Sequence, residues 1–192
     1  LTSEDFVVRL SSRDAWQKYF EERSSDSEKA TDFYQIVDKL EREDPEVSDK
    51  KLKELGFELA AVQDFIKQGN PTDELKIIID NLTARGLGDF VKIDYGVIRG
   101  LAYYTGPVFE AFDKKGAFRA ICGGGRYDHL VNLVSGGKVD LPALGFGMGD
   151  VVLAELLKAR DLVPEFGDDL DVFVLIEEES ERPASLGLIQ QL

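Results

Sequence analysis

Residues 99–106 combine side chains that could bind a small ligand, in the order Arg-Gly-Leu-Ala-Tyr-Tyr-Thr-Gly. The guanidinium of Arg99 suits an anion, and the phenols of Tyr103 and Tyr104 offer hydroxyl groups for a heteroatom and ring faces for a planar group. The alternative is structural. Side chains alternate along a strand, so one tyrosine could belong to the core while the other is half exposed.

Two glycine-rich segments could also contact a ligand. Residues 123–128 (Gly-Gly-Gly-Arg-Tyr-Asp) are expected between a strand and a helix, where three glycines allow close approach to the backbone or form a bulged turn. Arg126 and Asp128 could pair with each other. In residues 145–149, the alternating Gly145, Gly147 and Gly149 would leave one face of a strand bare, either for a flat adenine ring or for tight strand-to-helix packing.

Composition excludes several classes of site. Cys122 is the single cysteine and His129 the single histidine, so no intrachain disulfide, cysteine zinc site or histidine triad is possible, and we expect no metal site. We expect Cys122 in the core and His129 at the surface or capping a helix. A net charge of −14 gives no support for nucleic-acid binding by the chain as a whole.

The first half of the chain is predicted to be mostly helical. After a short strand at residues 5–10, apolar residues recur every three or four positions up to about residue 86, which predicts four or five helices. Gly56 and Gly69 are predicted to end helices, and Ser48 and Thr72 to cap them. The aromatic residues of this part are predicted to form its core: Trp16, Tyr19, Phe20, Phe33 and Tyr34.

The second half is predicted to be an antiparallel sheet, which gives an α+β fold. Short strands are expected at residues 90–95, 96–99, 108–113 and 118–122, with a hairpin turn at residues 113–116. Helices are expected at residues 127–133 and 150–159. Residues 164–169 have the composition of a linker, and a strand at 170–176 and a helix at 181–192 are expected to begin a second, incomplete domain.

In this order and spacing, the three segments resemble the histidyl-tRNA synthetase family. Residues 99–104 resemble its first histidine motif, residues 124–128 its second, and residues 142–153 motif 3 of class II synthetases. The resemblance implies the C-terminal half of an antiparallel catalytic domain with a helical insertion domain. It divides the chain into a catalytic strand (1–13), the insertion (14–87), the histidine motifs with motif 3 (88–163), and a linker with the start of an anticodon-binding domain (164–192).

The resemblance also implies an activity and its residues. The enzyme would join histidine to ATP as histidyl-adenylate and transfer the histidyl group to tRNA(His). Arg99 would be catalytic and bind histidine together with Tyr103, Tyr104 and Tyr127, while Gly145, Gly147 and Gly149 would bind ATP, which is accompanied by Mg²⁺. The full-length enzyme is expected to be a cytoplasmic homodimer, and the sequence has no apolar run of membrane-spanning length. Because motifs 1 and 2 lie outside these residues, the isolated chain is expected to be inactive.

Two positions depart from the family pattern. Val152 stands where motif 3 commonly has an arginine, and Ala102 stands where aspartate is frequent. The missing arginine favours an alternative, a synthetase-like regulatory subunit of ATP phosphoribosyltransferase, whereas the intact histidine motifs favour the synthetase. A synthetase-related binding module fused to another protein is a third possibility.

Overall fold

The computed structural model describes residues 1–98, 103–116, 118–165, 167 and 172–191. It forms two compact units, Leu1–Leu162 and Val163–Leu192. All residues of the candidate site that the structure describes belong to the first unit.

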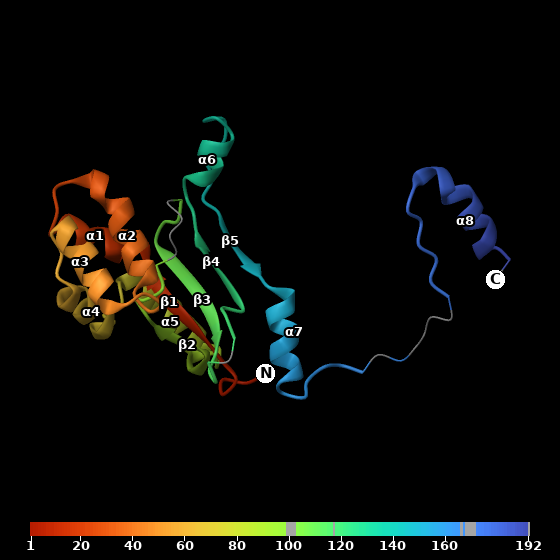
Figure 1. The fold of residues 1–192 in the computed structure, drawn as a ribbon, viewed down its shortest axis with the longest axis horizontal. Coiled ribbons are helices and arrows are strands. Elements are labelled where there is room, and N and C mark those ends of the chain that lie inside the picture. The colour runs from red at the N-terminus through yellow and green to blue at the C-terminus, as the bar shows by residue number, and fades with distance from the viewer. Residues whose placement is uncertain (99–102, 117, 166, 168–171, 192) are drawn as a thin grey trace. The chain divides into compact units, whose positions relative to one another are not determined.

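A five-stranded sheet organises the first unit (Figure 1). Its order is β2-β1-β3-β4-β5, with bounds β1 Phe6–Ser12, β2 Val91–Ile93, β3 Pro107–Asp113, β4 Cys122–Arg126 and β5 Leu144–Met148. With the helices, this sheet confirms the predicted α+β fold. The expectation of purely antiparallel pairing was wrong at one place, because β1 and β2 are parallel. A connection of several helices joins these two strands, and a long crossover of this kind is what parallel neighbours require.

Five α-helices connect β1 to β2, in agreement with the sequence pattern. They are α1 Arg13–Glu21, α2 Ala30–Lys39, α3 Pro45–Leu55, α4 Leu59–Gln68 and α5 Asp73–Ala84, with a 3-10 turn, η1 Ser27–Lys29, before α2. Gly56 and Gly69 follow α3 and α4 with φ of 91° and 56°, as C-terminal glycines do. Thr72 caps α5 by accepting from the Leu75 amide.

Ser48 is not a helix cap, contrary to the sequence prediction. It lies inside α3, and its hydroxyl donates to Glu43 at 3.0 Å. The cap is Asp44, whose carboxylate accepts from the Glu46 amide at 2.8 Å, and Pro45 occupies the first helical position. Proline is favoured there because its missing N–H would have no partner within the helix, and that signal outweighs the serine.

The predicted aromatic core is confirmed, and it extends to the sheet. The five aromatic side chains are buried in one cluster that also contains Leu10 of β1, Tyr95 and Ile98. The Trp16 ring lies edge-on to Phe65 and Tyr95, with centroids 4.8 and 6.3 Å apart. The connecting helices and the sheet therefore share one hydrophobic core.

Several strand boundaries differ from the prediction. Residues 96–98 and 118–121 are not strands, and residue 99 lies outside the described residues. The glycines at 123–125 are not a loop or a bulge but the centre of β4. A methyl group on Gly124 would lie 2.1 Å from the Gly145 carbonyl oxygen, so the close approach of β5 requires glycine here. The predicted turn is confirmed, since the Gly116 amide donates to the Asp113 carbonyl at 3.1 Å.

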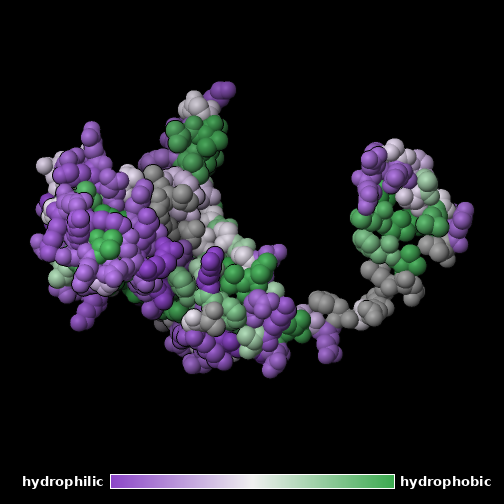
Figure 2. All heavy atoms as spheres, in the orientation of Figure 1, coloured by the Kyte–Doolittle hydropathy of each residue, from purple (hydrophilic) through white to green (hydrophobic). Residues whose placement is uncertain are grey.

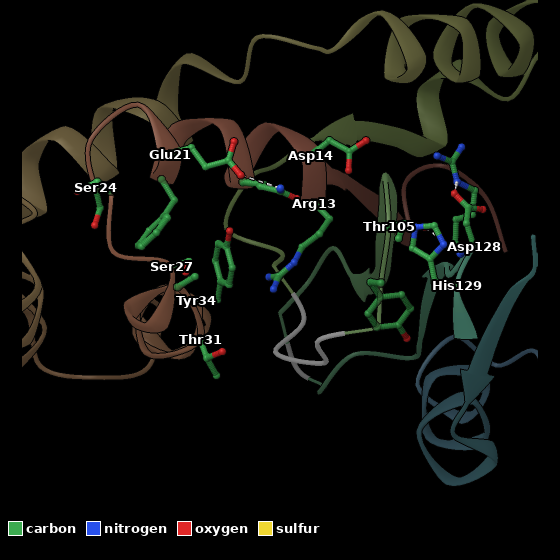
Figure 3. A pocket seen from close by; sticks show the side chains of 16 residues that line it. Arg13, Asp14, Glu21, Ser24, Ser27, Thr31, Tyr34, Thr105, Asp128 and His129 are labelled. Carbon is green, nitrogen blue, oxygen red and sulfur yellow. Dashed lines mark hydrogen bonds and ion pairs between the residues drawn. The ribbon is translucent and has the colours of Figure 1, made fainter. Parts of the chain in front are cut away.

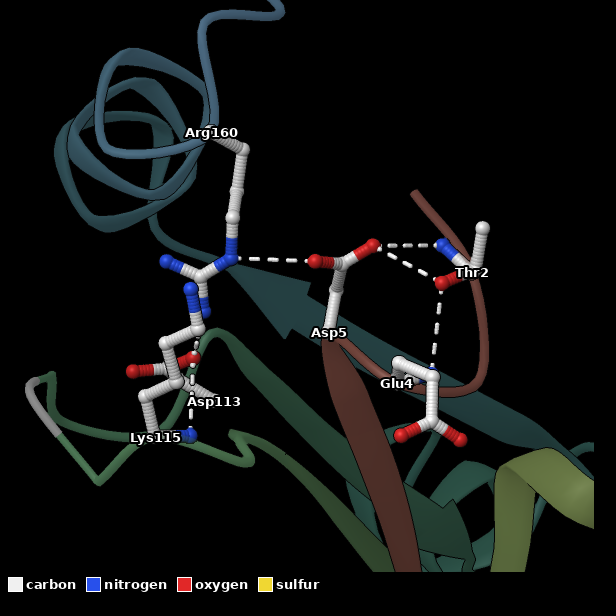
Figure 4. Close-up of polar contacts among 6 residues, drawn as sticks. All are labelled: Thr2, Glu4, Asp5, Asp113, Lys115 and Arg160. Atoms are coloured by element: carbon white, nitrogen blue, oxygen red, sulfur yellow. Dashed lines mark hydrogen bonds and ion pairs between the residues drawn. The ribbon is translucent and has the colours of Figure 1, made fainter.

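Three further helical segments complete the first unit. A 3-10 turn, η2 Gly88–Phe90, precedes β2, the short α6 Leu130–Val134 starts later than expected, and α7 Asp150–Lys158 matches its predicted range. Leu156 of α7 packs against Ala111 of β3 and against Ile121, which precedes β4. Beyond α7, Arg160 donates to Asp5 at 3.0 Å and to buried Asp113 at 2.5 Å, which fixes this end of the helix (Figure 4).

Apolar side chains lie exposed on α6 and on β5, which is the edge strand of the described sheet. Figure 2 shows hydrophobic atoms where α6 projects. The most exposed on these elements are Leu133, Val134, Leu144 and Phe146.

The second unit contains a 3-10 turn, η3 Glu179–Glu181, and α8 Arg182–Ile189, which confirms the predicted helix. The strand expected at 170–176 is absent from residues 172–176, and residues 170–171 lie outside the described part. A strand needs a hydrogen-bonded neighbour, and the described residues of this unit provide none. Among the residues described in both units, no helix is both long and apolar enough to cross a membrane.

Candidate histidine site

Three tyrosines from two distant segments meet beside the sheet. The Tyr103 and Tyr104 rings lie 4.7 Å apart, and the Tyr127 ring lies 5.8 Å from the first and 6.4 Å from the second. Tyr103 and Tyr104 precede β3 instead of lying in a strand, so the expected alternation to opposite faces does not apply. Tyr104 is 7% exposed and Tyr103 is 36% exposed, so the cluster has a buried side and an open side.

Backbone hydrogen bonds hold the two tyrosine segments together. The Thr105 amide donates to the Arg126 carbonyl at 2.8 Å, and the Asp128 amide donates to the Thr105 hydroxyl oxygen at 3.0 Å. Helix α1 is attached to the same place, because the Arg13 amide donates to the Gly106 carbonyl at 2.7 Å and the Gly106 amide to Asp14 at 3.1 Å. Hydrogen bonds between the two tyrosine segments, and between Gly106 and α1, therefore hold the aromatic cluster in place.

Arg126 links the tyrosine cluster to the helical connection. Its guanidinium forms an ion pair with Glu74 in the first turn of α5 and a second with Asp128 at 3.0 Å. The sequence left open a pairing of Arg126 with Asp128, and the structure shows it. Since both carboxylates hold this guanidinium, Arg126 orients the segment before Tyr127.

A cavity of 810 Å³ adjoins the cluster (Figure 3). Tyr104 and Thr105 line one part of it, and Arg13 of α1 and Tyr34 of α2 line another. The Arg13 guanidinium carbon lies 3.6 Å from the centroid of the Tyr34 ring, and both side chains project into this region in Figure 3. The cavity is large enough for an amino acid.

Burial shifts the pKa values of both Arg13 and Tyr34. Burial lowers the pKa of Arg13, and the neighbouring Tyr34 opposes that effect. Burial also raises the pKa of the Tyr34 phenol, and the neighbouring Arg13 opposes that effect. Within the described part of the chain, Nη1 of Arg13 has no hydrogen-bond partner. Arg13 was not predicted from the sequence, because an arginine at the start of a helix has no distinctive spacing.

The glycines of residues 145–149 have different surroundings. Gly145 and Gly147 belong to β5, and Gly149 precedes α7. A methyl group on Gly145 would lie 2.4 Å from the Tyr127 hydroxyl oxygen, whereas one on Gly147 would have nothing within 4 Å. Gly147 therefore presents open strand surface, and Gly145 is covered by a ring of the cluster.

The other residues considered from the sequence have different surroundings. Arg99 lies outside the described residues. Val152 packs beside the apolar cluster of Ala111, Ile121 and Leu156. His129 occupies the N-cap position of α6 but makes no side-chain cap, and Cys122 packs beside that apolar cluster, half-buried. Among the described residues, no group of three or more His, Cys, Asp or Glu side chains could hold a metal ion.

Comparison with known proteins identifies the family of this chain. The family model for histidyl-tRNA synthetase matches residues 13–150. A histidine–tRNA ligase of Opitutus terrae is 39% identical over 100% of this chain and 48% of its own length. A chloroplastic/mitochondrial histidine–tRNA ligase of Arabidopsis thaliana is 37% identical over 91% of this chain and 39% of its own.

A solved structure has the same fold. The histidyl-tRNA synthetase of Nostoc sp. PCC 7120 superimposes with a TM-score of 0.65 at 23% identity, covering 99% of this chain and 51% of that one. The sheet with its helical connection is thus a synthetase-like α+β domain. The chain belongs to the histidyl-tRNA synthetase family. It spans about half the length of the curated relatives it matches.

Proposed function

We propose that this chain is the histidine-recognising part of a histidine–tRNA ligase, which activates histidine with ATP and transfers it to tRNA(His). The convergence of Tyr103, Tyr104 and Tyr127 carries the proposal, because these residues come from the two segments that resemble the histidine motifs. A neutral imidazole needs one donor and one acceptor, and phenol hydroxyls can act as either. An amino acid without ring nitrogens would leave such hydroxyls unpaired and be rejected.

In the proposed reaction, the histidine carboxylate attacks the α-phosphorus of ATP in line, and pyrophosphate leaves. Negative charge builds up on the α-phosphate oxygens, so a fixed cation there lowers the barrier. By its motif position Arg99 has this role and also contacts histidine. The tyrosines bind and orient the substrate, and Arg126, held by Glu74 and Asp128, fixes the segment that carries Tyr127.

ATP is proposed to lie along the glycine face of β5. The open surface at Gly147 supports this proposal, and Gly149 extends the glycine face to the start of α7. Gly145 lies on the same face, next to the Tyr127 hydroxyl. Val152 supplies no charge to the phosphates. Mg²⁺ is proposed to accompany ATP, coordinated by its phosphates.

The proposal extends to the whole enzyme as a cytoplasmic homodimer and to the domain division at residues 14, 88 and 164. The regulatory-subunit alternative is not favoured, since the two curated relatives compared above carry ligase names.

The direct test is histidine-dependent exchange of pyrophosphate into ATP by the full-length enzyme. Tyr104→Phe and Tyr127→Phe should each raise the KM for histidine by roughly 10-fold, the cost of one substrate hydrogen bond, with less change in the KM for ATP. Tyr95→Phe is the matched control, because the Tyr95 hydroxyl donates to the Asn70 carbonyl away from the tyrosine cluster. Histidine binding without any exchange would support the regulatory alternative instead.

A further inference from the structure

The Tyr127 side chain lies over a strand position that has no side chain. The Tyr127 amide donates to the Ala143 carbonyl at 2.8 Å, which fixes the backbone beside the start of β5. From there the ring reaches along β5 to Gly145. A methyl group on Gly145 would lie 2.4 Å from the Tyr127 hydroxyl oxygen, 3.4 Å from Cζ and 3.5 Å from Cε1. Only the hydroxyl is too close, so the ring fits the strand because residue 145 is glycine.

The Tyr127 ring also contacts a second tyrosine. Tyr103 lies edge-on to Tyr127, with centroids 5.8 Å apart and planes at 88°. A methyl group at residue 145 would push the hydroxyl away from β5 by about 1 Å to reach an ordinary contact distance. Because the hydroxyl is the far end of a flexible side chain, we expect the tyrosine ring to move and the strand to stay in place.

We propose that Gly145 is a positioning residue for histidine recognition, which acts by fixing the hydroxyl of Tyr127. The inference rests on the proposed function in assigning Tyr127 to the substrate. A hydrogen bond requires a donor–acceptor distance of 2.7–3.2 Å, so a hydroxyl displaced by about 1 Å loses its partner on the imidazole. Gly145 then sets the affinity for histidine without contacting histidine.

A second glycine has a related relationship but is a poorer probe. A methyl group on Gly125 would lie 2.9 Å from Cδ1 of Tyr104, yet also 2.8 Å from the Pro107 carbonyl oxygen and 2.9 Å from Val108. Substitution there would disturb the pairing of β3 and β4 as well as the ring. Gly145 is the better position, because Tyr127 supplies all three of its nearest contacts.

A double-mutant cycle in the full-length enzyme tests the proposal. Gly145→Ala should raise the KM for histidine by roughly 10-fold, about the value of one hydrogen bond, and should change kcat less. In a Tyr127→Phe background the nearest contact of the new methyl becomes Cζ at 3.4 Å, so Gly145→Ala should add less than about 2-fold. Fully additive effects, or an unchanged KM in the single Gly145→Ala variant, would overturn the proposal.

Gly147→Ala is the matched control on the same strand and face. Nothing lies within 4 Å of its new methyl, and Gly147 is proposed to face ATP. It should therefore raise the KM for ATP and leave the KM for histidine unchanged. A rise in the KM for histidine equal to that of Gly145→Ala would show a general effect of β5 and contradict the proposal.

A stability cycle on residues 1–192 separates this inference from the proposed function. Gly145→Ala should lower the free energy of unfolding in the wild-type background, and Tyr127→Phe should restore most of the loss. If Gly145→Ala and Tyr127→Phe are coupled but the full-length enzyme shows no histidine-dependent pyrophosphate exchange, the geometric relationship is supported and the proposed function is rejected. If the enzyme shows pyrophosphate exchange but the two substitutions are coupled in neither cycle, only the role of Gly145 is rejected.

Discussion

The indole nitrogen of Trp16 donates a hydrogen bond of 3.1 Å to the backbone carbonyl of Tyr95, 79 residues later in the chain. Trp16 begins the helical connection in α1, and Tyr95 follows β2 at its end. The bond therefore closes the connection onto the sheet, and the same indole is fully buried in the shared core.

Trp16→Ala should destabilise the helices and the sheet together. We expect a loss of roughly 3–5 kcal/mol, from the cavity and the unpaired carbonyl. Urea unfolding followed by far-UV circular dichroism should show one transition at lower urea concentration. Lys18→Ala, an exposed change on the same helix, is the control. Separate unfolding of the helices would contradict a shared core.

Glu74→Gln should loosen the segment that carries Tyr127, because it removes one of the two carboxylates that hold Arg126. We expect the KM for histidine to rise by roughly 3-fold to 10-fold, since the ion pair becomes a weaker hydrogen bond from the guanidinium to a neutral amide. Asp73→Asn is a closely matched control, as Asp73 pairs with Lys76 at the surface. Equal KM values for the two variants would rule out a positioning role for Glu74.

Arg99→Ala should lower the rate of adenylate formation by roughly 100-fold to 1000-fold, the effect of removing a cation from developing charge. Its motif position motivates the prediction, and histidine binding should change less. Pyrophosphate exchange and equilibrium binding of histidine by the full-length enzyme measure the two effects. Arg85→Ala, an exposed arginine at the end of α5, is the control. Unchanged exchange in Arg99→Ala would reject the assignment.

Arg160→Ala should destabilise the first unit by about 3 kcal/mol, since it leaves the buried Asp113 carboxylate without its arginine. Thermal unfolding of the chain measures the loss. Arg182→Ala, which breaks an exposed ion pair with Glu179, should have no measurable effect. Similar melting temperatures for the two variants would show that the contacts of Arg160 do not stabilise the fold.

Alkaline pH should destabilise the protein through its buried phenols. Burial raises the pKa of Tyr19, Tyr34 and Tyr95. The unfolded chain releases these protons near pH 10, whereas the folded state still binds them. Their contribution to stability is full below the ordinary pKa and is lost as pH rises through the raised values. Absorbance titration should show these phenols ionising only as unfolding begins, and early reversible ionisation of all six tyrosines would contradict this.

The sequence predicted what local patterns determine. Helical spacing predicted four or five helices, of which the structure has five, together with their aromatic core, and glycine and threonine marked several helix ends. It did not predict that residues 123–125 are a strand, because glycine propensity favours a loop while the reason for these glycines is the approach of β5. The parallel pairing of β1 with β2 is likewise a long-range contact with no local signal.

For the candidate site, residue types were easier to predict than their surroundings. The meeting of Tyr103, Tyr104 and Tyr127 agrees with the predicted cluster, although the roles of these residues in binding stay a prediction. The contributions of Glu74 and Arg13 come from helices distant in sequence, and only the folded chain brings them to the tyrosines.

The exchange of hydrogen bonds between the start of α1 and Gly106 makes the first helix part of the frame around the tyrosines. A small rotation of α1 would move the loop before β3, since both the amide and the carbonyl of Gly106 are hydrogen-bonded to α1. Mild substitutions inside the helical core, far from any substrate, should therefore change the affinity for the amino acid before they unfold the protein.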